Sequence, residues 1–451
     1  MGTFPGQVSA GHYDAFLSKY DSEGVELWAK QFGSTGPAAD DSAPTPNLDT
    51  ATPSSNTEPG LSEPMILEAS LARDITLIGF DPYDKSGSAV AIGDLNGDGV
   101  PDIAIGALLG AAGDRRNTGE TYVLFGPVVA GTYDLGTSAD ITLNGLSLDD
   151  RSGAALAIGD LNGDGILDLA IGAYGAAFSR GETYVIFGPL AAGVFELPHV
   201  ADVILKGIEP GDISGYDLAA GDLNLDGVPD LVISAPAAGI AGKAYVIFGP
   251  LNPGVSELAD VVDVTIEGTE PINFVGSGLA VGDLNMDGAP DLVIGALSTS
   301  PEERANTGQT YVVFGPLDSG ILDLTDIADI TFNGIDPGDQ SGWALAVGDL
   351  NGDGDADLAI GAYRAGHDGR SIAGQSYIVS GPLAAGSYEL ASDADIVVNG
   401  IDPSDRMGYA LTIGDVNGDG IPDIAIGAYW ADPEQRVRAG ETYVILGPLS
   451  P

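Results

Sequence analysis

The sequence contains no cysteine and few basic or aromatic residues, and each shortage excludes a class of protein. Without cysteine, the 451 residues can form neither a disulfide framework nor a thiolate metal site. Only 16 Lys and Arg stand against 66 Asp and Glu, a formal net charge of −50. Such a surface repels the phosphate backbone of nucleic acids. No apolar run approaches the roughly 18 residues of a membrane span, so we expect neither a nucleic-acid partner nor membrane insertion.

The residues in excess are glycine and the acids. Aromatic residues make up only 7% while hydrophobic residues reach 44%, so the core must be built mainly from aliphatic side chains. The 67 glycines have no collagen-like period and therefore indicate many tight turns, as in an all-β fold with short strands. Divalent cations are the natural complement of so acidic a surface. A salt-rich habitat, where screening relieves the self-repulsion, is the alternative explanation.

One segment recurs along the chain. The sequence GDLNGDGVPDIAIGA at residues 93–107 has five further copies, each beginning with Gly-Asp. The leading aspartates of the six copies are Asp94, Asp160, Asp222, Asp283, Asp349 and Asp415. They lie 61 to 66 residues apart, and so regular a period predicts a ring or array of identical structural units.

Each copy contains four strand-like runs bounded by Gly, Pro and Asp. In the second copy these are residues 154–161, 168–173, 182–188 and 201–207. Runs of β-branched, aliphatic and aromatic residues of this length are typical of strands. Because the second run is almost continuously apolar, we expect it to be covered on both faces.

The two ends of the repeat region complement each other. It begins with a fourth-strand sequence at residues 73–79 and ends with a third-strand sequence at residues 441–447. Joining them leaves no exposed edge. The sequence therefore predicts an all-β fold, a β-propeller of six four-stranded blades closed by the strand at 73–79. An open linear array is the alternative.

The loop D-x-N-x-D-G-x-x-D carries the chemistry of each copy. In the first copy the side chains of Asp94, Asn96, Asp98 and Asp102 can converge if the chain curls tightly, which Gly99 permits. Position 7 adds a backbone carbonyl, and such oxygen donors suit Ca²⁺. The EF-hand is rejected because position 12 lacks Glu and the flanks are strands. An Asx-rich turn without metal is the alternative, which six intact copies disfavour. The candidate ligands are Asp94, Asn96, Asp98, Val100, Asp102, Asp160, Asn162, Asp164, Ile166, Asp168, Asp222, Asn224, Asp226, Val228, Asp230, Asp283, Asn285, Asp287, Ala289, Asp291, Asp349, Asn351, Asp353, Asp355, Asp357, Asp415, Asn417, Asp419, Ile421 and Asp423.

The repeats resemble FG-GAP repeats, the units of the integrin α-subunit N-terminal β-propeller. The resemblance rests on the acidic loop and on the sequence (I/V)GA that follows it. The resemblance covers residues 73–451. It implies that each loop joins the first two strands of a blade and holds one structural Ca²⁺, about six in all. Six Ca²⁺ would bring the formal net charge from −50 to −38. Where the family has Phe-Gly, this chain mostly has Ser-Gly. Integrin propellers have seven blades, so a seventh stays possible.

The N-terminal part differs from the repeats. Residues 12–35 show a hairpin pattern and resemble an SBBP repeat, another propeller unit, while residues 36–63 are rich in Pro, Ser, Thr and acid. We therefore divide the chain into an SBBP-like hairpin fragment at 1–35, a disordered linker at 36–63 and the calcium-binding propeller at 64–451. Starting within a repeat indicates a fragment of a longer protein.

The function implied by the resemblance is an extracellular or cell-surface module that binds a protein or glycan ligand on one propeller face. The location comes from the family, because the N-terminus lacks the features of a secretory signal. We do not expect an enzyme, since the three histidines are scattered and no G-x-S-x-G motif occurs. The alternatives are a propeller accessory to a hydrolase domain, or a structural spacer. Tyr174, Tyr363, Tyr429 and Trp430 follow second strands and could pack between blades or line a recognition face.

Overall fold

The computed structural model describes residues 64–111, 115–268, 274–301 and 304–450, and the backbone of two N-terminal strands. These strands, β1 (Ala15–Tyr20) and β2 (Glu26–Phe32), pair antiparallel with Ala15 opposite Phe32, as expected for a hairpin within 12–35. The expected linker at 36–63 lies outside the described residues. The chain divides into two compact units, residues 1–60 and 61–451, and every strand from β3 onward belongs to the second.

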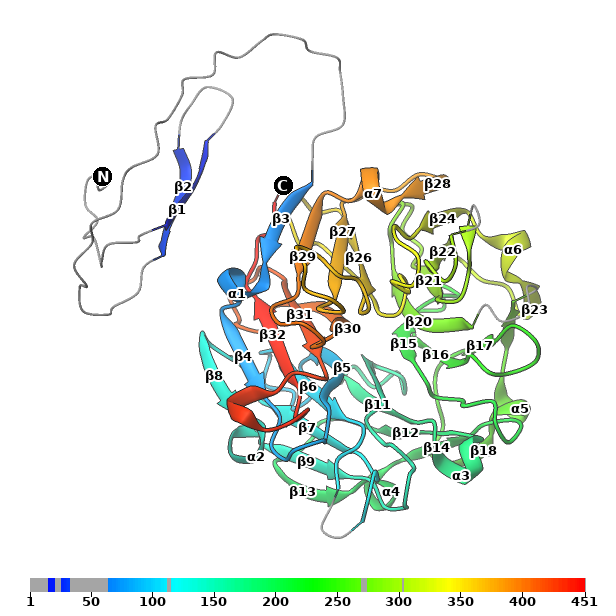
Figure 1. The fold of residues 1–451 in the computed structure, drawn as a ribbon. Coiled ribbons are helices and arrows are strands. Elements are labelled where there is room, and N and C mark those ends of the chain that lie inside the picture. Colours follow the sequence, from blue (N-terminus) through cyan, green and yellow to red (C-terminus); the bar gives the residue numbers. More distant parts are fainter. Residues whose placement is uncertain are drawn as a thin grey trace, which may run out of the picture. The chain divides into compact units, whose positions relative to one another are not determined.

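Six five-stranded sheets are arranged in a ring (Figure 1), and the order of strands in each runs from the innermost outward. Blade 1 contains β5 (Ser86–Gly93), β6 (Asp102–Ala107), β7 (Glu120–Leu124), β9 (Ile141–Asn144) and β13 (Gly193–Glu196). Blade 2 contains β10 (Ala155–Gly159), β11 (Asp168–Ala173), β12 (Glu182–Ile186), β14 (Val203–Lys206) and β18 (Gly254–Glu257). Blade 3 contains β15 (Leu218–Gly221), β16 (Asp230–Ala235), β17 (Lys243–Ile247), β19 (Val264–Glu267) and β23 (Gly320–Asp323).

The second half of the ring repeats this plan. Blade 4 contains β20 (Val275–Gly282), β21 (Asp291–Ala296), β22 (Gln309–Val313), β24 (Ile330–Asn333) and β28 (Gly386–Glu389). Blade 5 contains β25 (Leu345–Gly348), β26 (Asp357–Ala362), β27 (Gln375–Val379), β29 (Ile396–Asn399) and β3 (Met65–Glu68). Blade 6 contains β30 (Met407–Gly414), β31 (Asp423–Ala428), β32 (Glu441–Ile445), β4 (Ile75–Ile78) and β8 (Gly131–Asp134).

The ring closes where the two ends of the repeat region meet. Strand β4, within the predicted 73–79, pairs antiparallel with β32, and Leu77 lies opposite Thr442. The predicted closure and the count of six blades are therefore confirmed, and the possible seventh blade is absent from the described residues. The blades differ from the prediction by one strand, because a parallel fifth strand from the next repeat joins each sheet, as β13 joins β9.

A single helical turn connects each fifth strand to the fourth strand that follows it in sequence. These turns are α1 (Ala69–Ala72), α2 (Leu135–Ser138), α4 (Leu197–Val200), α5 (Leu258–Val261), α6 (Leu324–Ile327) and α7 (Leu390–Asp393). Outside this pattern lie α3 (Ala176–Ser179) and the 3₁₀ turn η2 (Pro433–Gln435). Every described helix is therefore at most four residues long, and none in the described part has the length and hydropathy needed to cross a bilayer.

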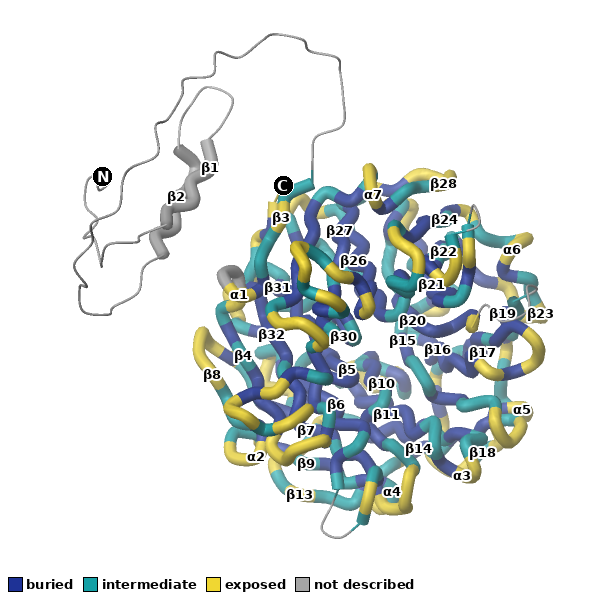
Figure 2. Tube along the Cα trace, in the orientation of Figure 1, coloured by how far each residue is buried: buried dark blue, intermediate teal, exposed yellow. Residues whose placement is uncertain are grey.

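The innermost and second strands are the most buried part of the ring (Figure 2). All six residues of β6 are buried, as are all six of β11. Glycine allows neighbouring blades to approach here, because a Cβ on Gly106 would lie 1.9 Å from the carbonyl oxygen of Gly153 in the next blade. The near-continuous apolar second strand of each repeat thus reflects cover on both faces.

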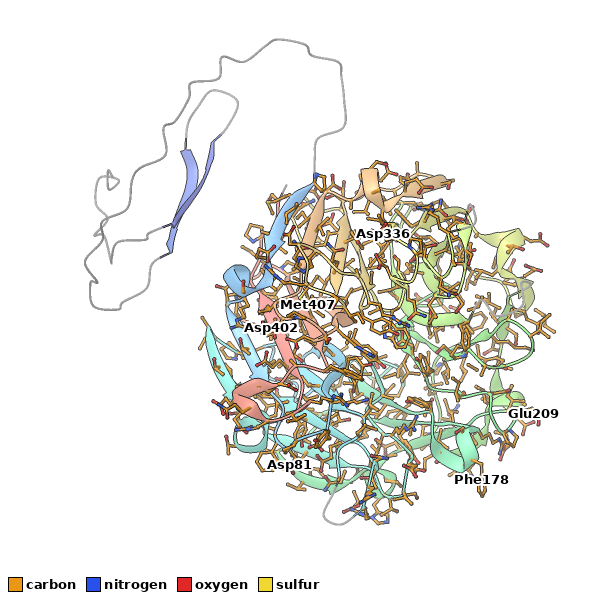
Figure 3. All side chains as sticks on the ribbon, viewed as in Figure 1. Asp81, Phe178, Glu209, Asp336, Asp402 and Met407 are labelled. Carbon is orange, nitrogen blue, oxygen red and sulfur yellow. The ribbon has the colours of Figure 1, made fainter. Side chains whose placement is uncertain are left out.

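A turn with the pattern D-x-S-G, varied in some copies, precedes each first strand. The x residue has a positive φ in every blade: Lys85 58°, Arg151 56°, Ile213 53°, Phe274 51°, Gln340 57° and Arg406 60°. In several copies an acid stands three positions before the turn's aspartate, as at Asp81, Asp336 and Asp402 (Figure 3). This turn precedes the first strand whereas the acidic loop follows it, so the two lie on opposite faces of the ring.

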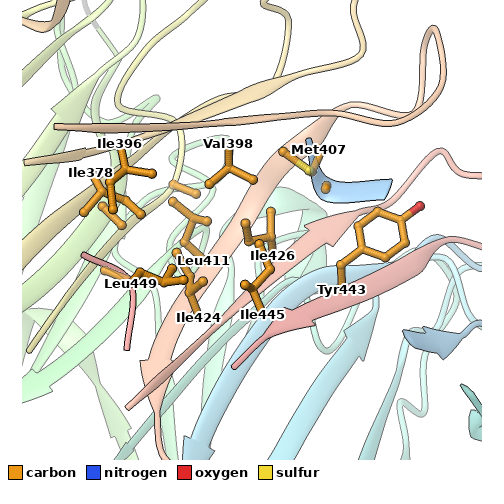
Figure 4. Packing of buried hydrophobic residues seen from close by; sticks show 14 of the residues in the cluster. Ile378, Ile396, Val398, Met407, Leu411, Ile424, Ile426, Tyr443, Ile445 and Leu449 are labelled. Carbon is orange, nitrogen blue, oxygen red and sulfur yellow. The ribbon is translucent and has the colours of Figure 1, made fainter. Parts of the chain in front are cut away.

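The hydrophobic core consists of six clusters, one between each pair of neighbouring blades. Between blades 5 and 6, Ile396 and Val398 pack against Leu411, Ile424 and Ile426 (Figure 4). The cluster between blades 6 and 1 contains Ile75 and Leu77 of β4. Closure therefore buries the strand that completes the ring.

Candidate metal sites

The acidic loops lie between the first and second strands of every blade. The first spans residues 94–101, between β5 and β6, and its ninth position, Asp102, begins β6. The thirty candidate ligands occupy the same positions in six equivalent loops on one face of the ring. The glycine at position 6 has a φ between 86° and 98° in all six, which only glycine adopts without strain. Each chain segment therefore curls as tightly as the ligand pattern requires.

Backbone N–H groups fix the first aspartate of the loop. Asp94 Oδ1 accepts hydrogen bonds from Gly97 N at 2.8 Å and Asp98 N at 3.1 Å, and its Oδ2 accepts from Gly99 N at 2.8 Å. The carboxylate of Asp98, at position 5, is held by the backbone of position 7, because Val100 N donates to Asp98 Oδ1 at 2.9 Å. The loop backbone thus holds the carboxylates close together although they repel one another.

The asparagine at position 3 lies beside the carboxylates of the loop. Asn96 Nδ2 lies 3.1 Å from Asp98 Oδ2 and 3.4 Å from Asp102 Oδ1. Oxygen ligands at right angles around Ca²⁺ are about 3.4 Å apart, given Ca–O distances near 2.4 Å. Asn96 Oδ1 accepts a hydrogen bond from Asp98 N at 2.8 Å, so the amide nitrogen faces the carboxylates. An oxygen at this position would require the amide to turn and give up that bond. The corresponding amide lies 3.0 Å from Asp226, Asp287 and Asp419 in three other loops.

The aspartate at position 9 is the buried member of the set. Asp102 has no exposed surface; its Oδ2 accepts from Leu95 N at 2.9 Å and its Oδ1 from Gly126 N at 2.9 Å. Burial raises the pKa of Asp102, and the Asp98 carboxylate adds to the increase, while the N–H donors act against it. Burial likewise raises the pKa of Asp230 and Asp357 to about 6. A cation in the loop would offset this cost of ionisation.

Each loop is also bonded to the next blade, a contact that sequence reasoning missed. Leu95 O at position 2 accepts a hydrogen bond from Leu190 N at 2.7 Å, and Leu190 belongs to the turn after the third strand of blade 2. The equivalent bonds run from Leu251 to Leu161, Leu317 to Leu223, Leu383 to Leu284, Leu449 to Leu350 and Val128 to Val416. The recurring Gly-Pro-Leu after the third strand, with Val128 in place of Leu in the first copy, was the available signal. The six loops thus form a closed chain of blade-to-blade contacts.

A second group of possible ligands, Glu68, His367 and Asp368, lies away from the loops. Their ligand atoms lie within 4.8 Å of one another, and His367 Nδ1 is buried without a hydrogen-bond partner. Both Glu68 oxygens, however, already accept hydrogen bonds, from Arg370 Nη1 at 2.7 Å and Asn399 Nδ2 at 2.9 Å. The guanidinium supplies the positive charge, so this group fits an ion pair better than a metal. Among the described residues, the aspartates of a loop do not form such a group by themselves, so an ion bound there would also require amide and carbonyl oxygens.

The four aromatic residues that follow second strands pack together on the opposite face. Tyr409 stacks on Tyr429 with ring centroids 3.6 Å apart and lies 5.5 Å from Tyr363, while Trp430 lies 6.1 Å from Tyr429. Tyr174 lies 5.2 Å from Tyr216. Tyr216 and Tyr409, together with Trp343, line one end of a central channel of about 250 Å³. These three residues precede or begin first strands and were missed by sequence reasoning.

The comparisons with known proteins agree with this architecture. The FG-GAP repeat family model matches residues 86–124, 152–186, 214–247, 275–313, 341–379 and 407–445. These intervals run from the start of the first strand, or the turn just before it, through the third strand of each blade.

The curated relatives that match the chain include phospholipases and integrin alpha chains. The human phosphatidylinositol-glycan-specific phospholipase D is 34% identical over 206 residues, 44% of this chain and 24% of that protein. Its Dictyostelium discoideum counterpart is 27% identical over 322 residues, 65% of this chain and 33% of that protein. Integrin alpha-PS2 of Drosophila melanogaster is 29% identical over 306 residues, 60% of this chain and 21% of that protein. The matched parts thus span a third or less of each relative. Six matched repeats on a closed six-bladed ring show that this chain belongs to the FG-GAP repeat family.

Proposed function

We propose that this propeller is a calcium-stabilised, non-catalytic module of an extracellular or cell-surface protein that binds a protein or glycan ligand. The observation that carries the proposal is the link between each acidic loop and the next blade. Asp102 accepts a hydrogen bond from Leu95 N, and Leu95 O accepts one from Leu190 of the following blade. An ion bound by Asp94, Asn96, Asp98 and Asp102 would therefore stiffen the blade contact as well as the loop.

Calcium in this role is structural. The loops offer carboxylate, amide and carbonyl oxygens, the donors that Ca²⁺ prefers, and sites of this kind in extracellular modules bind with Kd values of about 10⁻⁴–10⁻³ M. Similarity to integrin alpha-PS2 supports a binding or adhesion role and a location outside the cell, where calcium reaches such concentrations. On this proposal no residue of the chain performs a reaction.

The experiment is thermal unfolding of the full chain with calcium and with excess chelator, alongside a metal count by mass spectrometry. Metal that binds only the folded state raises the midpoint. We expect about six bound ions, one per loop, and a rise of many degrees with calcium. No bound metal and an unchanged midpoint would contradict the proposal and leave the loops as plain turns.

A second candidate function is favoured by one comparison. The chain matches 24% of a relative named as a phospholipase D, which suits a propeller that accompanies a hydrolase domain. Expressing the surrounding reading frame and assaying it for phosphodiester hydrolysis with and without the propeller would distinguish the two. Activity that needs the propeller would support the accessory role, and a frame without a catalytic domain would support the binding module.

A further inference from the structure

Four basic side chains gather at the end of the channel opposite the acidic loops. Arg406, Lys85 and Arg151 occupy the x position of the D-x-S-G turn in blades 6, 1 and 2, and Arg438 lies between β31 and β32. We call these four residues the cationic mouth. Blades 3, 4 and 5 have the uncharged Ile213, Phe274 and Gln340 at the same position. One half of the rim is therefore positive in a chain with a formal net charge of −50.

Each of the four cations lies over an aromatic ring. The guanidinium carbons of Arg406 and Arg438 lie 3.6 Å and 4.2 Å from the ring centroid of Trp430, and Lys85 Nζ lies 5.5 Å from it. Arg151 lies 5.2 Å from the ring of Tyr174. Cation–π contacts of this kind orient the charges. They bring no negative charge to the mouth.

Several donors of the mouth have no acceptor. Arg406 Nη1 donates to Tyr429 OH at 2.8 Å and Arg151 Nη1 to Tyr174 OH at 2.9 Å. The Nε atoms of both arginines and the indole Nε1 of Trp430 are buried without a hydrogen-bond partner. Across the described segments, none of the four cations forms an ion pair within 4.0 Å. Buried donors without acceptors are costly, so these three N–H groups lack an acceptor that a ligand could supply.

The neighbouring carboxyl groups do not supply that acceptor. Burial raises the pKa of Asp84 to about 8, and Glu120 and Asp81 add to the increase. Its neighbour in sequence, Lys85, has its pKa lowered to about 8 by burial and by the charges of Arg406, Arg438 and Arg151. The charges that act on Lys85 are therefore those of the other three cations of the mouth.

We propose that the cationic mouth binds a sulfate or phosphate ester group carried by a small ligand. A sulfate ester carries one negative charge and a phosphate monoester up to two, and both offer several acceptor oxygens, which match guanidinium donors and an indole N–H. The acidic remainder of the surface repels extended polyanions, so a single ester group suits this rim better than a polymer of them. The inference rests on the proposed binding function, since it names the ligand class, but it uses the face away from the acidic loops.

The test measures binding of glucose 6-sulfate, glucose 6-phosphate and uncharged glucose to the full chain by calorimetry, at about 0.15 M salt to screen long-range charge. The variants are Arg438→Gln and Lys85→Gln, with Arg116→Gln as the matched control. Arg438 and Arg116 are both exposed, and Arg116 lies outside the mouth. The calcium-induced rise of the unfolding midpoint is measured on every variant to verify the fold.

We expect saturable binding of at least one ester and none of glucose. Each mouth variant should weaken binding on the order of tenfold, the loss of one charge-assisted hydrogen bond, while Arg116→Gln binds as the parent does. Preference for one ester assigns the group as sulfate or phosphate. Absence of binding to either ester, or equal binding by Arg438→Gln and the parent, would overturn the inference. If the calcium response persists in that case, the proposed calcium function still stands; ester binding without any calcium response would reject that function alone.

Discussion

Arg370 Nη1 lies 2.7 Å from Glu68 Oε2, joining two residues 302 positions apart in sequence. Glu68 ends β3, the fifth strand of blade 5, and Arg370 precedes β27 of the same blade. The same pair recurs as Arg115–Glu196, Arg180–Glu257, Arg304–Glu389 and Arg436–Asp134. In each of these blades a cation before the third strand holds the acid at the end of the fifth. We call these the latch pairs.

The latch pair at Glu68 should hold β3 against β29, its neighbour in blade 5. We expect Glu68→Gln to accelerate hydrogen exchange at the amides of β3 and to lower the free energy of unfolding by up to about 1 kcal/mol. The cost is small because the two side chains are 25% and 32% exposed, and partly exposed ion pairs contribute little.

The matched control is Glu196→Gln, which breaks the pair with Arg115. Its strand, β13, lies in blade 1, so exchange at β3 should not change. Equal acceleration of β3 in both variants would show that the latch at Glu68 has no local effect.

Each acidic loop should bind its ion independently. We expect Asp283→Asn to reduce the number of bound calcium ions by one. It should also lower stability in calcium by about 1.4 kcal/mol at a concentration tenfold above Kd. In chelator the variant should match the parent, because no ion is bound in either. Mass spectrometry and calcium-dependent unfolding measure both effects.

Asp355→Asn provides the control within the same motif. Asp355 occupies position 7, where only the backbone carbonyl is a candidate ligand, and it is the one acid at that position among the six loops. This variant removes a negative charge from the face of the loops without removing a ligand. Loss of an ion from this variant as well would indicate a general charge effect.

The buried Asp84 should make stability fall as the pH rises. Its Oδ2 has no hydrogen-bond partner, and burial raises its pKa from 3.8 to about 8 in the folded state. The folded protein therefore holds this proton more tightly than the unfolded chain does. The penalty is absent below about pH 4 and grows as the pH rises toward 8.

Asp84→Asn should therefore stabilise the protein at pH 8, by about 1–3 kcal/mol on the scale of a desolvated carboxylate, and should have little effect near pH 4. Urea unfolding across this range measures the difference. The control is Asp81→Asn, since Asp81 is exposed and contributes only through its charge. A stabilisation by Asp84→Asn that is equal at both pH values would contradict the assignment to ionisation.

The acidic loops contain a second left-handed position that sequence reasoning did not anticipate. Position 4 has a positive φ in every loop, and it is glycine in four of them but Leu225 (φ 60°) and Met286 (φ 61°) in the other two. Left-handed conformations cost a residue with a Cβ about 1–2 kcal/mol. Met286 is 55% exposed, so little packing is lost on its removal.

We therefore expect Met286→Gly to raise the free energy of unfolding by up to about 1 kcal/mol, after the entropy that glycine gains in the unfolded chain. Met286→Ala keeps the Cβ and should give no such gain. Urea unfolding with calcium at a fixed concentration compares the three proteins. A gain from alanine equal to that from glycine would point to the exposed methionine side chain and not to the backbone.

The sequence allowed the ring to be predicted because each repeat carries the same buried strands. The second run at 168–173 is β11 to the residue, since Asp168 and the Gly-Ala that ends it are fixed by the loop and by blade contact. The orphan strand at 73–79 required a partner, and β32 is the strand that it pairs with. Both predictions rest on the local sequence pattern of the repeat and on the need to pair the N–H and C=O groups of an edge strand.

The fifth strand could not be predicted in the same way. Residues 193–196, which form β13, contain glycine and acid and are not fully buried, so their extended conformation is set by pairing with β9 of the preceding repeat. The cationic mouth escaped notice for the opposite reason. It is formed by the residues at which copies differ, such as Arg151 and Ile213, whereas a repeat is recognised by what its copies share.

Because of the fifth strand, one sequence repeat does not correspond to one blade. No sheet is encoded by one repeat alone, because β13 of the second repeat completes the first blade and β3 completes the fifth. Each repeat therefore contributes strands to two neighbouring blades, and deleting a single repeat removes strands from two sheets. The seam between β32 and β4 uses the same pairing as every other blade. Circular permutation at any of the other five outer connections would therefore move the chain ends and leave the architecture intact.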